Sequence, residues 1–173
     1  MQQFTIRSAD YSDIDRIAQV HIQSWQETYP GIMPAKRIEA LNQESCMRNW
    51  RRSMDLGYRI FVALVQDEIV GFVSGAENRS NEHCETGTGD ACECELAAIY
   101  LLQQHQRKGI GKALFDRFVT KMQQEGFHSM VVWVAELNPS TGFYAALGGE
   151  LVDRKMLLIC EEAIPVIAYK YVI

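Results

Sequence analysis

The sequence has little proline and no long hydrophobic run. Four prolines stand among 173 residues, and no apolar stretch approaches the ~18 residues that a membrane-spanning helix requires. Residues 1–7 predict a strand and contain neither the basic segment nor the apolar segment of a secretory signal. We therefore expect a cytoplasmic protein without a membrane partner.

Basic residues are also scarce. Lys and Arg number 17 against 22 Asp and Glu, which gives a net charge of −5. A nucleic-acid-binding domain usually carries a basic stripe, so this balance argues against nucleic acid as a partner. The charge suits a cationic ligand such as an amine, although a charge of this size more often serves solubility alone.

The cysteines do not form the regular pairs of a disulfide-bonded or zinc-binding protein. The five cysteines are Cys46, Cys84, Cys92, Cys94 and Cys160. His83 stands beside Cys84, but the spacing to Cys92 and Cys94 lacks the paired C-x2–4-C of a structural zinc site. A polar hairpin loop explains the cluster better, and we predict no metal. A disulfide from Cys84 to Cys92 or Cys94 is sterically conceivable, but a reducing compartment disfavours it.

Length and composition predict one globular domain over residues 1–173. Apolar residues make up 47% and charged residues 23% of the chain, which is typical of a chain with one sizeable core. Apolar patterning predicts strands at residues 4–7, 58–65, 69–74, 93–102, 129–135, 151–160 and 164–172. It predicts helices from a cap at Asp10 or Ser12 to Trp25, and over residues 34–50, 110–122 and 140–147. These interleaved elements predict an α/β protein with a mixed sheet covered by helices.

The segment at residues 106–111, Gln-Arg-Lys-Gly-Ile-Gly, is the most informative part of the chain. It follows an apolar run and opens a helix in which Ile110, Leu114, Phe118 and Met122 recur every four residues. Unpaired N–H groups at such a helix start attract anions, and glycine lets a phosphate approach without a Cβ in the way. We call residues 106–112 the glycine turn, and it predicts a phosphorylated cofactor.

Two familiar phosphate-binding motifs do not fit the glycine turn. A dinucleotide fingerprint needs a third glycine where Leu114 stands, three residues after Gly111. A P-loop needs four residues between its glycines and a Ser or Thr after its lysine, but Ala113 follows Lys112. The spacing present is Gln-x-x-Gly-x-Gly, after a strand that starts near Glu95.

The full motif, Glu-Leu-x-x-Ile-Tyr-Leu…Gln-x-x-Gly-x-Gly-x-x-Leu, resembles the acetyl-CoA-binding region of the GCN5-related N-acetyltransferases, the GNAT superfamily. Residues 138–149 resemble its pattern Asn-Pro-…-Phe-Tyr-…-Leu-Gly-Gly, although Ser140 and Thr141 stand where the family often has alanine. The resemblance is firm over residues 93–150. It implies the GNAT fold, a mixed and mainly antiparallel sheet of six or seven strands flanked by about four helices. It also implies two splayed strands that admit the pantetheine arm of acetyl-CoA.

The resemblance further implies which residues hold acetyl-CoA. Backbone N–H groups of residues 107–112 would bind the pyrophosphate, and the backbone of residues 99–101 would pair with the pantetheine arm. Asn138 would contact the same arm, or else cap the short helix that follows it. The expected cofactor-binding residues are Ile99, Tyr100, Leu101, Gln106, Arg107, Lys108, Gly109, Ile110, Gly111, Lys112, Asn138 and Tyr144.

Acetyl transfer to an amine needs a base and a proton donor, because a lysine-like ammonium has a pKa of ~10.4 and a thiol one of ~8.5. By resemblance, Tyr144 is the expected donor to the departing thiolate, since a phenol stays protonated at pH 7; closing the core is its alternative role. Glu95 is the expected base, which would act through a water on the acceptor ammonium. Glu93, on the same face of the strand, is its rival.

The acceptor pocket is expected near the end of the first helix. In proteins that resemble this one, the connection after that helix lines the pocket, which points to Tyr29 at the rim with Trp25 and Glu95 nearby. His21 falls on the apolar stripe of the same helix, so we predict a buried, hydrogen-bonded core histidine.

The leading hypothesis is an N-acetyltransferase that moves an acetyl group from acetyl-CoA to a primary amine of a small molecule or peptide. Neither motif contains a cysteine, so direct attack in a ternary complex is expected rather than an acetyl-enzyme. Two alternatives stay open: a non-catalytic acyl-CoA sensor on the same fold, and a metal-binding regulator that uses His83 and its neighbouring cysteines. A homodimer is a family-level expectation, and the sequence does not name the acceptor.

Overall fold

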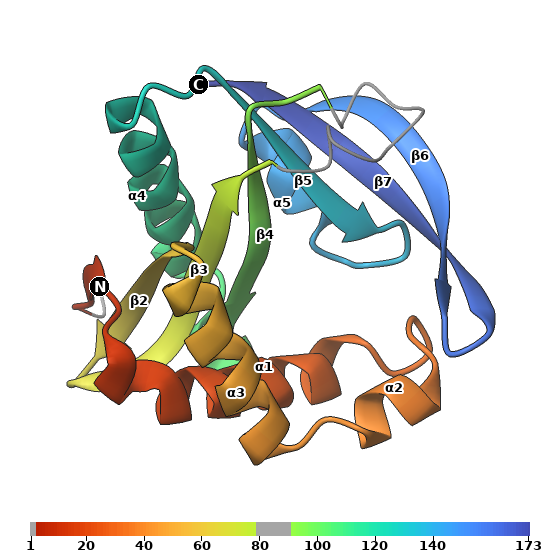
Figure 1. Ribbon diagram of the computed structural model, residues 1–173, viewed down its shortest axis with the longest axis horizontal. Coiled ribbons are helices and arrows are strands. Elements are labelled where there is room, and N and C mark those ends of the chain that lie inside the picture. The colour runs from red at the N-terminus through yellow and green to blue at the C-terminus, as the bar shows by residue number, and fades with distance from the viewer. Residues whose placement is uncertain (1–2, 79–90) are drawn as a thin grey trace.

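The computed structural model describes residues 3–78 and 91–173. Within these ranges the chain forms one seven-stranded sheet and five α-helices (Figure 1). The strands are β1 (Thr5–Ser8), β2 (Arg59–Val65), β3 (Glu68–Glu77), β4 (Cys94–Leu101), β5 (Ser129–Ala135), β6 (Glu150–Ile159) and β7 (Glu162–Val172). The helices are α1 (Ile14–Thr28), α2 (Ala35–Glu39), α3 (Gln43–Asp55), α4 (Ile110–Gln124) and α5 (Thr141–Ala146).

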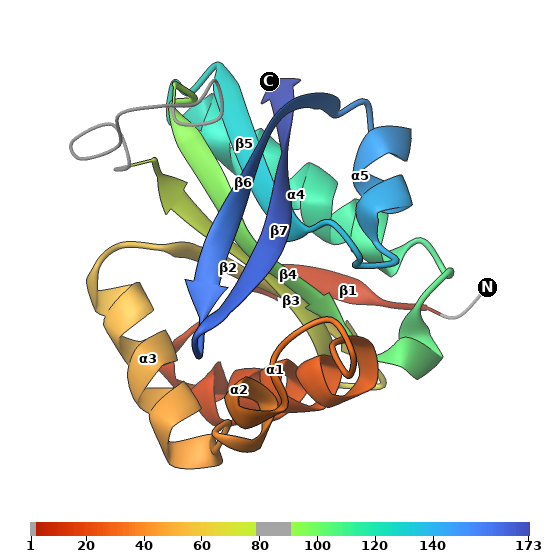
Figure 2. The same cartoon turned by 90° about the vertical axis from the view of Figure 1, so that its right-hand side faces the viewer.

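The sheet runs in the order β1-β2-β3-β4-β5-β7-β6, and every neighbouring pair is antiparallel except β4 and β5. Helices α1 and α3 pack on one face of its first half, and α4 packs on the other (Figures 1 and 2). Each helix buries one apolar stripe, as amphipathic helices do. This arrangement confirms the predicted fold class.

Strand β4 contains a bulge that changes which layer its side chains reach. It pairs residue for residue with β3 except at Ala97, which is an extra residue on β4. Before the bulge, Leu96 packs in the core under α4; beyond it, Tyr100 packs among residues of α1 and α3. Both positions are even, so an unbroken strand would have placed the two side chains on one face.

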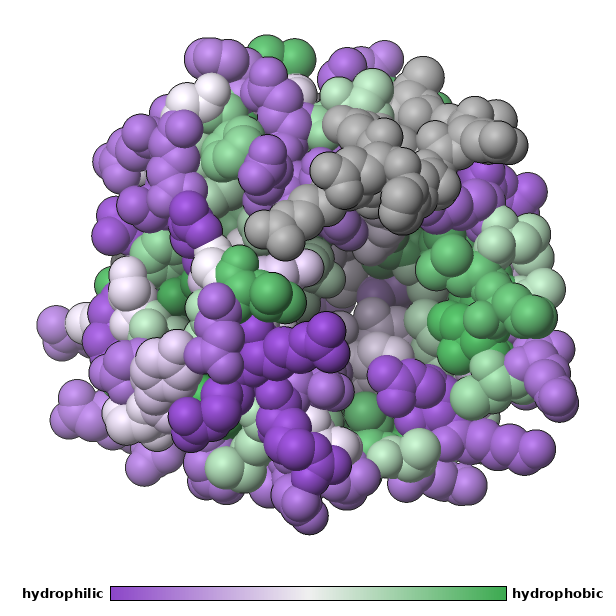
Figure 3. All heavy atoms as spheres, viewed as in Figure 1, coloured by the Kyte–Doolittle hydropathy of each residue, from purple (hydrophilic) through white to green (hydrophobic). Residues whose placement is uncertain are grey.

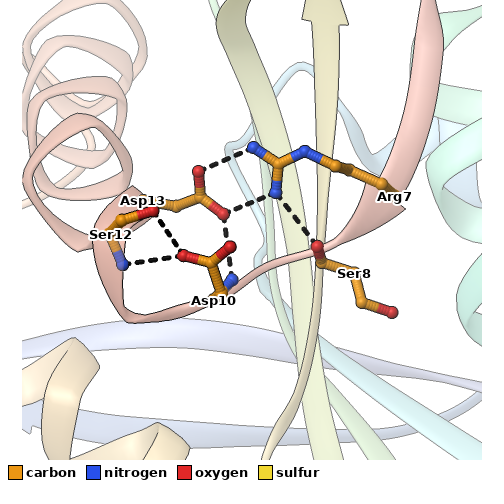
Figure 4. Close-up of polar contacts among 5 residues, drawn as sticks. All are labelled: Arg7, Ser8, Asp10, Ser12 and Asp13. Atoms are coloured by element: carbon orange, nitrogen blue, oxygen red, sulfur yellow. Dashed lines mark hydrogen bonds and ion pairs between the residues drawn. The ribbon is translucent and has the colours of Figure 1, made fainter.

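The first helix is fixed to the sheet by a polar turn (Figure 4). Asp10, one of the two predicted caps, accepts a hydrogen bond from the Ser12 N–H at 2.8 Å. The Asp10 N–H donates to Asp13 Oδ2 at 2.9 Å, which completes a capping box. The Arg7 guanidinium donates two hydrogen bonds to the buried Asp13 carboxylate, at 2.6 and 2.7 Å. This pairing with Arg7 holds the pKa of Asp13 below its ordinary value.

One helix predicted over residues 34–50 is in fact two. Helix α2 ends at Glu39 and α3 begins at Gln43. The Asn42 side chain accepts a hydrogen bond from the Ser45 N–H at 2.9 Å and so caps a new helix. The apolar spacing continues across the break, which is why the pattern alone missed it. The other predicted elements are confirmed, with ends shifted by a few residues at most.

The predicted loop at residues 77–91 falls almost wholly outside the described residues, and so do His83 and Cys84. Across residues 3–78 and 91–173, no three His, Cys, Asp or Glu side chains lie close enough together to hold a metal ion. In the same part of the chain, no helix is long and apolar enough to cross a membrane.

Candidate active site

Strands β4 and β5 pair only where they begin. Parallel pairing joins Cys94 to Met130 and Glu95 to Val131, after which the two strands diverge. Strand β5 stays paired with β7 along its whole length, so the edge of β4 beyond Glu95 is left open toward β5. A cavity of 850 Å³ fills the space between the two strands, α1 and the start of α4.

The surface of the molecule is hollowed beside the β6–β7 hairpin (Figure 3). Apolar residues gather beside this hollow (Figure 3), and β6 carries the exposed side chains of Met156, Leu157 and Leu158. Of these, Leu157 lines the cavity. The hairpin therefore contributes an apolar wall opposite α1.

One end of the cavity is the glycine turn. Gly109 caps α4 with a φ of +84°, a left-handed conformation that glycine adopts freely. The first helical bond of α4 runs from the Ala113 N–H to the Gly109 carbonyl at 3.0 Å, so helix geometry leaves the amides of residues 110–112 without a carbonyl partner. A Cβ at Gly109 would meet no atom within 4 Å. The turn thus offers unpaired N–H groups and open space, which fits a phosphate group.

Three hydrogen bonds hold the segment that leads into the turn. The Leu102 N–H donates to the Val70 carbonyl at 3.0 Å. The Gln106 side-chain amide donates to the Leu101 carbonyl at 3.0 Å, and the Gln103 N–H donates to Glu27 Oε2 at 3.0 Å. The turn is therefore anchored to β3, to β4 and, through Glu27, to α1.

Positive charge borders the glycine turn. Arg107 and Lys112 both line the cavity, and Arg107 adopts a φ of +58°, uncommon for a residue with a side chain. The Lys112 ammonium pairs with Asp116 one turn along α4, at 2.5 Å. Lys112 is therefore partly neutralised, and Arg107 is the stronger source of positive charge at this end.

Tyr144 lines the cavity from α5 and is only 7% exposed. Its ring packs edge-on against Phe143 and lies stacked near Tyr169, at centroid distances of 5.4 and 5.9 Å. The Tyr171 hydroxyl donates to the Tyr144 carbonyl at 2.8 Å, which fixes the backbone. Burial, and then the neighbouring phenols, raise the pKa of Tyr144 above its ordinary value. The phenol is therefore neutral at physiological pH.

An aromatic group stands at the other end of the cavity; its members are His21, Trp25, Tyr29 and Tyr100. The Trp25 indole N–H donates to the Tyr100 hydroxyl at 2.9 Å, and the Trp25 and Tyr29 rings lie 4.6 Å apart. His21 stacks on Tyr100 with 5.1 Å between centroids. Of the four, Tyr29 and Tyr100 line the cavity itself.

His21 is the core histidine that its place on the apolar stripe predicted. It is partly buried, and its Nδ1 accepts a hydrogen bond from the Trp50 indole at 3.2 Å. Burial, and then the charge of Arg37, lower the pKa of His21 to about 4. The imidazole is therefore neutral at pH 7 and contributes to packing rather than to charge.

Asn138 joins the aromatic group to α5. Its side-chain N–H donates to the Tyr29 hydroxyl at 3.2 Å, and its Oδ1 accepts from the Ser140 N–H at 2.8 Å. The second bond steadies the turn that starts α5. Asn138 is buried and lines the cavity, so it shapes the wall between Tyr29 and Tyr144.

Comparison with known sequences identifies this arrangement. The sequence model of the Acetyltransferase (GNAT) family matches residues 16–148. The chain belongs to the GNAT family. It is 40% identical over 151 residues to the uncharacterized N-acetyltransferase YuaI of Bacillus subtilis, a match that covers 86% of this chain and 81% of YuaI.

Solved structures share the GNAT fold at lower identity. A phosphinothricin acetyltransferase from Sinorhizobium meliloti, solved with acetyl-CoA, is 22% identical with a TM-score of 0.73, over 99% of this chain and 89% of its own. The PaiA N-acetyltransferase of Thermoplasma acidophilum, solved with coenzyme A, is 20% identical with a TM-score of 0.68, over 98% and 99%. At these identities the likeness establishes the fold alone.

Most residues predicted for the site of this GNAT protein do line the one cavity. Those that line it are Tyr29, Ile99, Tyr100, Leu101, Gln106, Arg107, Gly109, Gly111, Lys112, Asn138 and Tyr144. The others lie close by: Lys108 and Ile110 belong to the glycine turn, and Trp25 packs behind Tyr29 and Tyr100. Glu95 is on β4, two residues before the bulge, and is not among the lining residues of the described chain.

The two candidate bases differ in their surroundings. Glu93 is exposed, and its carboxylate accepts a hydrogen bond from the His128 N–H at 2.5 Å. Glu95 is partly buried where β4 is paired on both sides, with Ala76 and with Val131. Because Leu96 faces α4, strand alternation puts Glu95 on the α1 side of the sheet, the side of the aromatic group.

Sequence reasoning missed the part of the cavity wall that α1 provides. Ser24, Glu27 and Thr28 line the cavity, and they share one face of the helix because they lie three and four residues apart. Ser24 lies on the apolar stripe of α1, among the buried residues of that helix. The only signal in the sequence was therefore a small polar residue at a stripe position, which a buried core serine would also give.

Proposed function

We propose that this protein moves an acetyl group from acetyl-CoA to the primary amine of a small molecule or peptide, by direct attack in a ternary complex. The observation that carries the proposal is one continuous cavity that contains the glycine turn, the open edge of β4 and Tyr144. A cavity of this size has room for the cofactor arm and for an acceptor, so no covalent enzyme intermediate is needed.

The glycine turn would hold the diphosphate of acetyl-CoA. An exposed anion at a helix start is stabilised by about 0.3–1 kcal/mol, and adjacent amides act together as a nest. Arg107 adds positive charge at the same end. The backbone of residues 99–101 is open toward β5 and would pair with the pantetheine arm. When bound, acetyl-CoA supplies the activated acetyl thioester.

Tyr144 would stabilise the departing thiolate. Its raised pKa keeps the phenol protonated, so it can donate a hydrogen bond to the sulfur as negative charge develops there. The phenol is a weaker acid than a thiol, which has a pKa of ~8.5. The proton that the thiolate finally receives therefore comes from the newly acetylated nitrogen, and Tyr144 passes it on.

Glu95 would accept the ammonium proton through a water. Its place on the α1 side of β4, just before the bulge, directs it toward the acceptor end rather than the glycine turn. Glu93 is the weaker candidate, because it precedes β4, is exposed and lies beside His128 rather than beside the aromatic group. Tyr29 and Trp25 would form the acceptor side, where the buried Tyr29 ring and the partly buried Trp25 ring would exclude water from the attacking amine.

Release of free thiol tests the proposal. The protein is mixed with acetyl-CoA and a panel of polyamines, amino acids, aminoglycosides and peptides, and coenzyme A thiol is followed with a colorimetric reagent. Turnover with at least one amine, and loss of turnover when the amine is already acetylated, is the expected result. Tight acetyl-CoA binding without turnover across the panel would favour the non-catalytic sensor instead.

The cytoplasm is the compartment we propose. Cys46 and Cys94 are buried thiols and Cys160 is an exposed one, and all three are unbridged. Burial raises the pKa of the Cys94 thiol to about 12, so it is unreactive. An exposed free thiol such as Cys160 suits a reducing environment. The expected homodimer stays a prediction that light scattering in solution would test.

A further inference from the structure

The hydroxyl of Ser24 is buried in the cavity wall without a hydrogen-bond partner. Ser24 is 3% exposed, and nothing in residues 3–78 or 91–173 bonds to its Oγ. Yet the residue lines the 850 Å³ cavity. Buried hydroxyls are nearly always paired, and an unpaired one costs folding free energy. A polar atom placed at that cost in a ligand cavity points to a partner that the ligand supplies.

The position of Ser24 on α1 tells which part of the cavity it serves. Glu27 lies three residues further along the same helix face, and its carboxylate accepts hydrogen bonds from the Gln103 N–H at 3.0 Å and from the Gln23 side chain at 2.9 Å. Gln103 lies two residues after the end of β4 and leads into the glycine turn. This face of α1 is therefore held beside the carboxyl end of β4.

The open edge of β4 lines the same stretch of cavity. Residues 99–101 are paired with β3 on one side, while their other side faces the gap toward β5. The aromatic group is supplied by neighbouring positions of α1, such as Trp25, whose indole bonds to Tyr100. One helix thus presents Ser24 toward the end of β4 that joins the glycine turn, and aromatic rings toward the acceptor end.

We propose that the Ser24 hydroxyl hydrogen-bonds to an amide of the pantetheine arm of acetyl-CoA, so that α1 forms a third wall of the cofactor channel beside β4 and β5. The inference rests on the proposed function, which puts acetyl-CoA in this cavity. The arm has two amide groups, and a hydroxyl can donate to a carbonyl or accept from an N–H. Glu27 is the positioning residue: through Gln103 it holds α1 beside the segment that leads into the glycine turn.

Substitution of Ser24 by alanine tests the proposal by calorimetry. Ser24→Ala should weaken coenzyme A binding by about three- to tenfold, the loss expected for one hydrogen bond. Binding of adenosine 3′-phosphate 5′-diphosphate, which has the nucleotide and diphosphate but no pantetheine arm, should not change. The melting temperature of the free protein should not fall, because the substitution removes an unpaired polar atom.

Ser74 provides a matched control. It is 0% exposed, and its hydroxyl also has no partner in the described chain, but it does not line the cavity. Ser74→Ala should leave coenzyme A binding unchanged. Ser24→Cys keeps the shape of the side chain with a weaker donor, and its affinity should fall between those of wild type and Ser24→Ala.

Several outcomes would overturn the inference while leaving the enzyme assignment intact. Equal coenzyme A affinity in wild type and Ser24→Ala would contradict the inference. It would also be contradicted if Ser24→Ala weakened binding of the nucleotide fragment as much as binding of coenzyme A, or if Ser74→Ala lost as much coenzyme A affinity as Ser24→Ala. A raised KM for the amine with unchanged coenzyme A affinity would assign Ser24 to the acceptor instead. Failure of the wild-type protein to bind coenzyme A would end the proposed function itself.

Discussion

The two ends of the cavity are built from different parts of the molecule. At the glycine turn, the groups that we propose to bind acetyl-CoA are backbone amides at the start of α4, positioned by Gly109 in a left-handed conformation. At the other end, which we propose for the acceptor amine, they are largely buried rings from α1, from Tyr29 after it and from β4, joined by hydrogen bonds such as that from Trp25 to Tyr100. A backbone site depends on local conformation, whereas a side-chain site depends on distant segments that meet only in the folded chain. The two ends should therefore respond to different kinds of substitution.

The largest effect is expected at the glycine turn. Gly109→Asp should abolish acetyl-CoA binding measured by calorimetry, because a side chain at a φ of +84° is strained and the carboxylate repels a diphosphate. Gly126→Asp is the matched control: Gly126 has a φ of +90° near the other end of α4, with no atom within 4 Å of an added Cβ. It should retain binding. Equal affinities in the two variants would remove the turn from the cofactor site.

Tyr144 stands between the two ends and tests the chemistry rather than the binding. Tyr144→Phe should lower kcat by about a hundredfold, the lower range for loss of a general acid, while the KM for acetyl-CoA stays within about twofold. Tyr169→Phe keeps the stacked ring beside Tyr144 but changes a hydroxyl outside the cavity lining, so its kcat should match wild type. An unchanged kcat in Tyr144→Phe would leave the tyrosine with a packing role only.

A smaller effect is expected at the acceptor end. Tyr29→Phe removes the hydroxyl that accepts from Asn138 at 3.2 Å and leaves a buried amide unpaired. The KM for the amine should rise about fivefold, the equivalent of one ordinary hydrogen bond, with little change in the KM for acetyl-CoA. Tyr11→Phe removes an exposed hydroxyl that bonds to Asp55 away from the cavity and should change neither. A change confined to the KM for acetyl-CoA would contradict the assignment of Tyr29 to the acceptor end.

The smallest effect concerns stability outside the cavity. The folded-state pKa of Asp13 is lowered by Arg7, so the pair stabilises the fold above the unfolded pKa of ~3.9 and loses that contribution as the pH falls through the lower folded value. Asp13→Asn should lower the free energy of unfolding at pH 7 by about 1–2 kcal/mol in urea, a modest loss because Arg7 is partly exposed.

Lowering the pH should reduce the difference in free energy of unfolding between wild type and Asp13→Asn. Wild type should lose more stability than Asp13→Asn between pH 5 and pH 2, while the turnover of the folded variant at pH 7 should equal that of wild type. A stability gap between the two proteins that does not shrink in acid would mean that the charge of Asp13 contributes nothing.

The cofactor end was largely readable from the sequence, and the acceptor end only in part. Glycine spacing and a following apolar stripe encode a turn and a helix start within a few residues, and Gly109 and Gly111 stand in the cavity wall as expected. The α1 wall was missed, because Ser24 on the apolar stripe looks like an ordinary core serine and Glu27 looks like an ordinary surface residue. The break between α2 and α3 was missed as well. The apolar spacing continues across the break, but the Asn42 side chain caps a new helix there.

The sequence by itself determined the order of strands and helices, the family and the position of the glycine turn, because each depends on residues that are neighbours along the chain. Only the tertiary structure decided that β4 and β5 part after two paired positions, that the Ala97 bulge turns Tyr100 toward α1, and that Ser24 faces into the cavity. These features depend on the register between strands and on which helix face meets the sheet. Contacts between distant segments set both, and no local pattern records them.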